Sequence, residues 1–309
     1  MGKDEFRYQI INEMPYPLGL LYRNLCQSYL LYEETQQQEA FRRDLFSFGY
    51  GFSHFLSLLN LKQYLAEDPL SSPNLNKQIL QTFRSKPAIR WQILLTQNLT
   101  KVGFRPFIQE LKDILQKPVP MALIAPFQDD ETLHEDCISI LSYFFEIPNP
   151  LSSKKIKAYF QLAEFLLQEY SFLKEYYLVV PQEDHFWLCQ GTQPKLTRMR
   201  TALQFDRHWE GHLFLVSKSQ SYLNLHPFIV FKKHENQPEL HFLHQEIASR
   251  VQYVGHGLKS LYLDNELAPG ILSHYQKIVI SLRNFSLTSR VQRFHKPSEL
   301  PQRKFIQFH

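Results

Sequence analysis

The hydrophobic period of the chain changes near residue 178, and this change limits the fold more than any other feature. Before it, apolar residues recur at helical spacing in long segments, most clearly in residues 36–67. After it come short segments rich in β-branched and aromatic residues, such as YYLVVP, HFWLCQG and FIVFKK, separated by turn residues. The sequence therefore predicts an α+β protein.

We predict three parts along the chain. Residues 1–177 form an N-terminal helical bundle, residues 178–265 a small antiparallel β domain, and residues 266–309 a helix followed by a basic C-terminal tail. No run approaches eighteen uncharged apolar residues, so we expect no membrane-spanning segment and no membrane partner. The three cysteines, Cys26, Cys137 and Cys189, are widely spaced and odd in number, which indicates no disulfide framework and favours a cytoplasmic location.

Charge is distributed unevenly along the chain. Residues 1–180 contain 18 Lys and Arg against 20 Asp and Glu, whereas residues 181–309 contain 16 against 10. An RNA or DNA partner would therefore meet the C-terminal half. Its candidate phosphate contacts are interleaved with phenylalanines that offer stacking surfaces, and they are Arg283, Arg290, Arg293, Lys296, Arg303 and Lys304. The alternative is that these phenylalanines pack on the sheet while the charges are solvated.

Histidines raise the question of a metal site, because eleven of the thirteen follow residue 180. His208 and His212 have the H-x-x-x-H spacing that suits a helix, but Gly211 and the following LFLV favour a strand, on which four residues span about 13 Å. Two imidazoles that far apart do not share one ion. Spacing along a single strand therefore predicts no metal ligand and no cofactor.

The stretch NLHPFIVFKKHENQPELHFLHQ (224–245) carries four histidines and is predicted to be a β-hairpin. Alternation along a strand places His241 and His244 on opposite faces. Histidines from different strands can still converge in space, and one sequence leaves that arrangement open.

Other catalytic signatures are absent from the sequence. It contains no G-x-S-x-G, no Walker loop, no G-x-G-x-x-G and no C-x-x-C. Cys26 and Cys137 lie in apolar helical patterns, which leaves Cys189 as the one cysteine candidate for a nucleophile. Because these signatures are absent, we predict no catalytic residue, and Cys189 remains only as an alternative.

Two stretches carry a resemblance to a known family. PYPLGLLYRNL (15–25), followed by FGYGFSHFLSLLNLKQYL (48–65), resembles the opening of a helical module of bacterial multidomain signalling and defence proteins. Residues 224–257 resemble the β module that follows it there, with a proline-flanked strand, a hairpin, and a strand ending in tyrosine and glycine. The helical part is similar to the HEPN family of nucleotide-binding and ribonuclease-type bundles, and the resemblance covers about a fifth of the chain.

One departure from that family bears on activity. Catalytic HEPN bundles use an arginine and a histidine four to six residues apart on one helix. In the helical half, His54 follows Arg43 by eleven residues and His134 follows Arg105 by twenty-nine. The resemblance therefore implies an HEPN-like bundle without the ribonuclease chemistry.

These observations favour a non-catalytic cytoplasmic regulatory protein, an adaptor or sensor that acts through a protein partner in bacterial signalling or defence. The first alternative is an RNA- or DNA-binding protein that uses the basic β domain and tail. The second is a nuclease or hydrolase of unrecognised type, for which Cys189, or His208 with His212, would be the residues to change.

Overall fold

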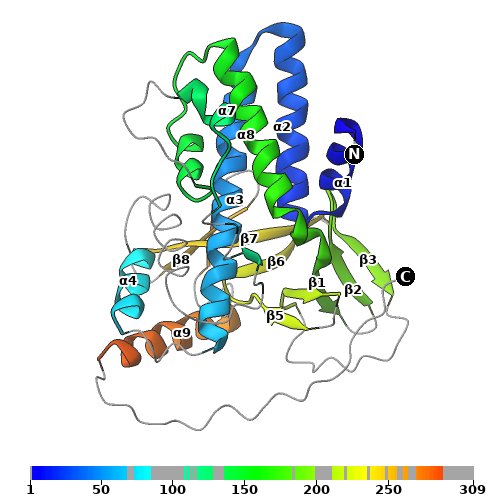
Figure 1. Ribbon diagram of the computed structural model, residues 1–309. Coiled ribbons are helices and arrows are strands. Elements are labelled where there is room, and N and C mark those ends of the chain that lie inside the picture. Colours follow the sequence, from blue (N-terminus) through cyan, green and yellow to red (C-terminus); the bar gives the residue numbers. More distant parts are fainter. Residues whose placement is uncertain are drawn as a thin grey trace.

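The computed structural model shows the predicted α+β arrangement, with helices first and two antiparallel sheets after them (Figure 1). The structure describes residues 2–67, 73–84, 136–182, 185–198, 211–218, 221–234, 237–247, 250–255, 260–263 and 269–287, together with parts of 108–127. All structural statements below concern these residues.

The helical half is built from helices of very different lengths. Its α-helices are α1 (Lys3–Glu13), α2 (Tyr16–Thr35), α3 (Gln38–Glu67), α4 (Pro73–Arg84), α7 (Met121–Ile124) and α8 (Ser153–Glu169). Its 3-10 helices are η2 (Ala125–Phe127), η3 (Ser139–Phe144) and η4 (Tyr170–Glu175). Helix α9 (Pro269–Leu287) follows the sheets.

Local sequence accounts for several helix ends. Pro17 stands in the first turn of α2, where a missing N–H costs nothing. Gln36 ends the same helix in the left-handed conformation, and its N–H bonds to the Tyr32 carbonyl. The side chain of Ser152 caps α8 by accepting a hydrogen bond from the N–H of Lys155.

Helix α3, the longest of the described helices, continues through Gly49 and Gly51 without a break. A Cβ on Gly49 would lie 2.1 Å from Cβ of Phe144, and one on Gly51 would lie 2.5 Å from Leu21. The two glycines therefore permit close approach of η3 and α2 to α3. Of the two interpretations that glycines in a helix allow, a kink or a close crossing, the structure shows the close crossing.

Among the described residues, nine strands form two antiparallel sheets. The first has the order β3-β2-β1-β4-β5, with β1 (Tyr176–Gln182), β2 (His185–Cys189), β3 (Lys195–Arg198), β4 (Phe214–Ser217) and β5 (Tyr222–Asn224). The second has the order β6-β7-β8-β9, with β6 (Ile229–His234), β7 (Gln237–Ile247), β8 (Arg250–Val254) and β9 (Ser260–Leu263). The predicted hairpin is β6 with β7, paired from Ile229↔Phe242 to His234↔Gln237.

Backbone contacts join the two sheets where β5 leads into β6. An isolated bridge pairs His212, just before β4, with Val230 of β6. The N–H of Leu225 donates to the carbonyl of Leu213 at 2.8 Å. These contacts fix the position of His212 relative to the turn that connects the sheets.

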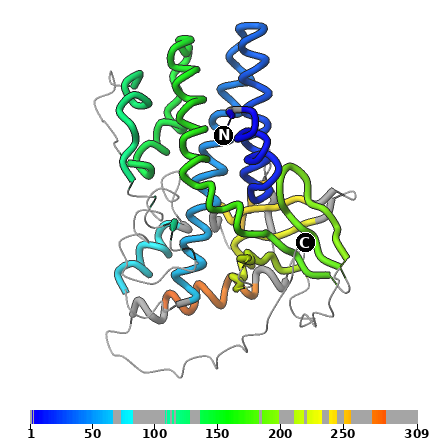
Figure 2. The backbone as a smooth tube through the Cα atoms, turned by 45° about the vertical axis from the view of Figure 1, so that its right-hand side comes forward, coloured from blue at the N-terminus to red at the C-terminus, as the bar shows by residue number. Residues whose placement is uncertain are grey.

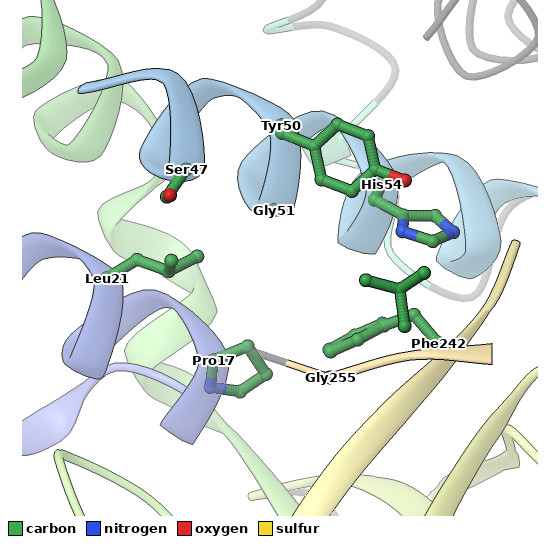
Figure 3. Close-up of a pocket in the computed structure, with 9 residues that line it drawn as sticks. Pro17, Leu21, Ser47, Tyr50, Gly51, His54, Phe242 and Gly255 are labelled. Atoms are coloured by element: carbon green, nitrogen blue, oxygen red, sulfur yellow. The ribbon is translucent and has the colours of Figure 1, made fainter. Parts of the chain in front are cut away.

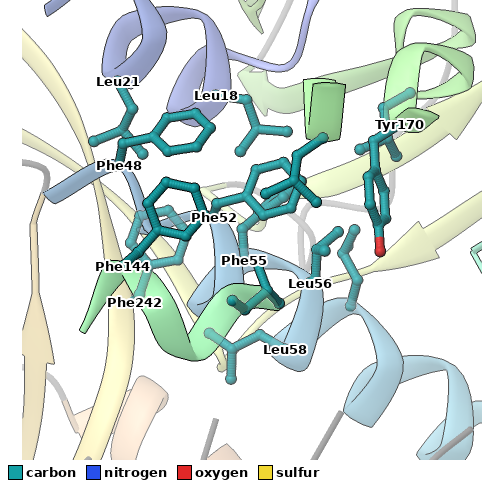
Figure 4. Close-up of a cluster of buried hydrophobic side chains, with 14 of the residues drawn as sticks. Leu18, Leu21, Phe48, Phe52, Phe55, Leu56, Leu58, Phe144, Tyr170 and Phe242 are labelled. Carbon is teal, nitrogen blue, oxygen red and sulfur yellow. The ribbon is translucent and has the colours of Figure 1, made fainter. Parts of the chain in front are cut away.

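The hydrophobic core is shared by both halves of the chain. One cluster of buried side chains includes residues of the helices, of both sheets and of α9. At its centre, Phe48, Phe52 and Phe55 of α3 meet Tyr170 of η4 and Phe242 of β7 (Figure 4). Helix α3 reaches from the group of upright helices to the level of the sheets, where α4 and α9 lie near its far end (Figure 2).

The change from helix to strand falls at Tyr176, two residues before the predicted start of the β domain. Helix α9 occupies part of the predicted 266–309 segment, and residues 288–309 lie outside the described residues. A search of the described helices found none with the length and apolar content needed to cross a membrane.

Candidate metal centre

Three histidines from three different elements meet beside the junction of the two sheets. His212 lies two residues before β4, His226 lies in the turn between β5 and β6, and His274 lies on α9. One ring nitrogen of each lies within 4.8 Å of one ring nitrogen of the other two. We refer to His212, His226 and His274 as the histidine trio.

Asn224, the last residue of β5, organises two members of the trio. Its Oδ1 accepts a hydrogen bond from the backbone N–H of His226 at 2.9 Å. Its Nδ2 lies 3.1 Å from Nδ1 of His212, so the amide N–H donates to that nitrogen. Nδ1 of His212 is therefore unprotonated, and the proton of the neutral ring is on Nε2.

The three rings are in direct contact. Those of His212 and His226 stack, with centroids 4.0 Å apart and planes 10° from parallel. The ring of His274 stands edge-on to both, at 5.6 Å from His212 and 5.1 Å from His226. Two rings in such contact do not both carry a charge, because two protonated imidazoles would repel each other.

The electrostatic surroundings keep the rings neutral. Burial, then His274 and Lys62, lowers the pKa of His212 to about 4. Burial, then the other two rings and Lys62, lowers the pKa of His226 to about 2. The pKa of His274 is also lowered, by burial, Lys277 and Lys62. At pH 7 all three imidazoles are uncharged, which is the form that binds a metal ion.

Lys62 of α3 connects the trio to the helical half. Its ammonium donates to the backbone carbonyl of His226 at 2.7 Å and lies 5.4 Å from the ring centroid of Phe228. Burial lowers the pKa of Lys62 to about 8, so the group is still largely charged at pH 7.

The donor set fits a divalent transition-metal ion such as Zn²⁺. Zinc binds imidazole nitrogens at about 2.0–2.1 Å with tetrahedral geometry, which places ligand nitrogens about 3.4 Å apart. The nitrogens of the trio lie within 4.8 Å, so displacements of about 1 Å would bring them to that geometry. His226 is buried, while His212 and His274 are partly exposed.

The stacked pair sets a condition on binding. An imidazole nitrogen bonds a metal in the plane of its own ring, and two parallel rings 4.0 Å apart do not share such a plane. The rings of His212 and His226 must therefore tilt apart to hold one ion. Binding also replaces or reorients the Asn224 bond to His212, at a cost of about 1 kcal/mol.

A second group of histidines has a different use. On α3, Nε2 of His54 donates to the backbone carbonyl of Leu243, and Tyr50 Oη is hydrogen-bonded to Nδ1 of His244 at 2.6 Å. We refer to Tyr50, His54 and His244 as the α3–β7 polar group. Two of its members, Tyr50 and His54, line a small pocket between α2, α3 and the second sheet (Figure 3). Its hydrogen bonds join the two halves of the chain.

His241 and His244 lie on one strand, as predicted. The side chains of Phe242 and His244 face α3, where both contact His54. In contrast, Nε2 of His241 lies 3.5 Å from Oε2 of Glu239 on the same strand. His241 and His244 therefore lie on different faces of β7. His208 lies outside the described residues, so the predicted separation of His208 from His212 stays a prediction.

The structure limits the other candidate residues. Cys189 is fully buried on β2, and burial raises its pKa, so its thiol is not the thiolate that a nucleophile requires. Arg283 is exposed on α9. The remaining predicted phosphate contacts, Arg290, Arg293, Lys296, Arg303 and Lys304, lie outside the described residues.

A larger hollow of about 460 Å³ lies between α1, α2 and α8. The rings of Tyr29 and Phe160 stack there with centroids 4.1 Å apart. Nε of Arg7 forms an ion pair with Oε1 of Glu164 at 2.8 Å. The charged groups of Arg7 and Glu164 are thus already matched to one another.

Sequence reasoning missed the trio. It compared pairs of histidines by their spacing along one strand. In the structure, however, His212 precedes a strand, His226 lies in a turn and His274 lies on a helix. His274, which completes the group, was not weighed as a ligand. The signal in the sequence was the concentration of histidines in the second half, together with an open alternative that histidines of different strands converge.

No family model, curated protein or solved structure matches the chain. The resemblance to HEPN bundles therefore stays a prediction, and function has to be argued from the geometry of the described residues.

Proposed function

We propose that the protein is a regulatory metal-binding protein, in which His212, His226 and His274 bind one divalent transition-metal ion. The observation that carries the proposal is the convergence of three neutral imidazoles from three elements within 4.8 Å. Three imidazole ligands with one remaining position suit Zn²⁺, and also Co²⁺ or Ni²⁺.

The placement of the ligands supports a sensing role. An ion held by His274 of α9 and by the two histidines at the sheet junction ties that helix to the sheets. Helix α9 also packs against α4 of the helical half. Because the stacked rings must tilt apart on binding, occupancy is coupled to a change of structure at this junction. We propose that a protein partner in the cytoplasm responds to this change, and that the protein itself is non-catalytic.

The test is metal binding by the full-length protein. Isothermal titration with Zn²⁺, and metal analysis after dialysis, should give one ion per chain. Loss of even an outer partner of a metal ligand weakens binding about 10–100-fold, so H274A, which removes a ligand, should weaken it by at least about 100-fold. His185→Ala, at a histidine of β2, is the matched control and should bind as the wild type does. Equal affinity in H274A and the wild type would refute the proposal.

Nucleic-acid binding is the second candidate, favoured by the exposed Arg283 on α9 and by the basic sequence that follows it. Binding of an RNA or DNA oligonucleotide that weakens steeply with salt, and that R283A reduces, would support this candidate. Salt-independent or absent binding would remove it.

A further inference from the structure

The inference concerns the fourth ligand of the proposed metal ion, and it rests on the proposed function. Three histidines leave one position open on a four-coordinate ion. The charges around the trio indicate what kind of group fills that position.

The centre is rich in positive charge. The three imidazoles are neutral and contribute no negative charge. The ammonium of Lys62 lies 2.7 Å from the carbonyl oxygen of His226, and Lys277 follows His274 by three residues on α9. Both charges lower pKa values in the trio. Among the described residues, no carboxylate contributes to the pKa of any member of the trio. A divalent ion would add two further positive charges to these two ammonium groups.

Lys62 is placed to share an anion with the ion. An ammonium has three N–H donors, and one of them is given to the His226 carbonyl at 2.7 Å. His226 is itself a proposed ligand, so the ammonium is fixed next to the coordination sphere. An anion with several oxygen atoms can place one oxygen on the metal and another on the Lys62 ammonium, in a charge-assisted hydrogen bond.

We infer that the metal-loaded centre binds a small oxyanion of the phosphate type, coordinated by the ion and hydrogen-bonded to Lys62. The anion offsets the charge of the ion and both lysines, and it completes the coordination that the protein leaves open. Free phosphate and the phosphate of a nucleotide share this chemistry. In the sensing role proposed above, the ligand that the protein reports is then the anion on its metal.

The experiment uses full-length protein loaded with Co²⁺, because four-coordinate Co²⁺ absorbs visible light and its spectrum responds to a change of ligand. The protein is titrated with inorganic phosphate, with a nucleoside monophosphate and with acetate in a non-coordinating buffer at pH 7. We expect a saturable spectral change with phosphate and a weaker response to acetate. A stronger response to the nucleotide than to inorganic phosphate identifies the nucleotide as the source.

Lys62 variants separate the anion site from the metal site. K62Q removes the charge, and we expect it to weaken phosphate binding by about tenfold while Co²⁺ still binds. K62R keeps a cation and should retain phosphate binding close to that of the wild type. K277Q, which removes the lysine that acts on His274 alone, should have a smaller effect than K62Q.

Three results decide the matter. A Co²⁺ spectrum that does not respond to any of the three anions overturns the inference but leaves the metal site intact. Equal phosphate affinity in K62Q and the wild type also overturns it. Failure of Co²⁺ to bind at all, in protein shown to be folded, overturns the proposed function together with the inference.

Discussion

The histidine trio and the α3–β7 polar group use the same residue type in opposite ways. In the polar group, the Nε2–H of His54 donates a hydrogen bond to the Leu243 carbonyl, and His244 is hydrogen-bonded to Tyr50. Both rings therefore join the helical half to the second sheet. In the trio, the only side-chain hydrogen bond to a ring nitrogen among the described residues is that of Asn224, and the rings face one another.

The difference shows that histidine content alone does not identify a site. A buried imidazole whose nitrogens are bonded to groups on neighbouring elements stabilises the fold. Neutral imidazoles whose nitrogens face each other offer lone pairs to an ion. The two groups should therefore respond differently to mutation and to metal.

The largest expected effect is on stability. H54A removes a fully buried ring that contacts Phe242 and leaves the Leu243 carbonyl without its imidazole donor, so the free energy of unfolding should fall by about 3 kcal/mol. Urea denaturation measures this change. Zinc affinity of the folded variant should remain that of the wild type, and a large loss of affinity would contradict the separation of the two groups.

Zinc should stabilise the protein through the trio alone. An ion that binds only the folded state at about 100 times its dissociation constant adds about 2.7 kcal/mol to the free energy of unfolding. Thermal unfolding with and without Zn²⁺ should show a rise in Tm for the wild type and for H244Q. H226A and H274A should show no rise, and a rise of wild-type size in either would place the ion elsewhere.

Acid should destabilise the protein through both groups of histidines, because the pKa values in each are lowered, and the α3–β7 polar group offers a variant that isolates one ring. Burial lowers the pKa of His244 to about 4, and burial with the neighbouring His244 lowers that of His54 to about 3, from an unfolded value near 6.5. The unfolded chain therefore binds more protons, so the stabilisation is complete above pH 6.5 and is lost as the pH falls toward 4.

H244Q tests the contribution of one ring to this pH dependence. The amide can still bond Tyr50 but does not titrate. Each titrating histidine contributes up to about 1.4 kcal/mol per pH unit, so between pH 6.5 and 4.5 the variant should lose about 2 kcal/mol less stability than the wild type. Denaturation curves across that range give the comparison, and parallel losses would show that His244 is not protonated on unfolding.

The smallest expected effect sharpens the role of Asn224. In N224D the carboxylate can accept from the His226 N–H and from a protonated Nδ1 of His212, and a carboxylate next to a ligating histidine raises its basicity. Zinc affinity should rise by about tenfold. Asn12→Asp, at an exposed position of helix α1, makes the same charge change far from the trio along the chain and should leave zinc affinity unchanged. An equal gain in that variant would show that net charge alone causes the effect.

The fold could be predicted because the hydrophobic period is strong on both sides of the change. Segments such as 36–67 and FIVFKK bury one face or both, and tertiary packing reinforces the local preference. Helix α1 (Lys3–Glu13) was not predicted, since KDEFRYQIINE has few apolar residues in a helical pattern. Its Ile10 nevertheless packs into the shared core.

The candidate site could not be predicted, because no local pattern connects its ligands. His226 and His274 are forty-eight residues apart, and they meet only because α9 returns to the sheet junction. Strand periodicity gave the correct faces for His241 and His244, which are set within one element. The position of His212 beside His226 depends on the pairing of β4 with β5 and on Asn224, which are properties of the folded chain.

The most direct test of the account is X-ray absorption at the zinc edge of the full-length protein loaded with one equivalent of Zn²⁺. The account predicts a first shell of nitrogen and oxygen atoms at about 2.0–2.1 Å, with the outer scattering of three imidazole rings, and H274A treated in the same way should not give this three-ring spectrum. A sulfur shell at about 2.3 Å, or a spectrum that H274A leaves unchanged, would contradict the claim that His212, His226 and His274 hold the ion.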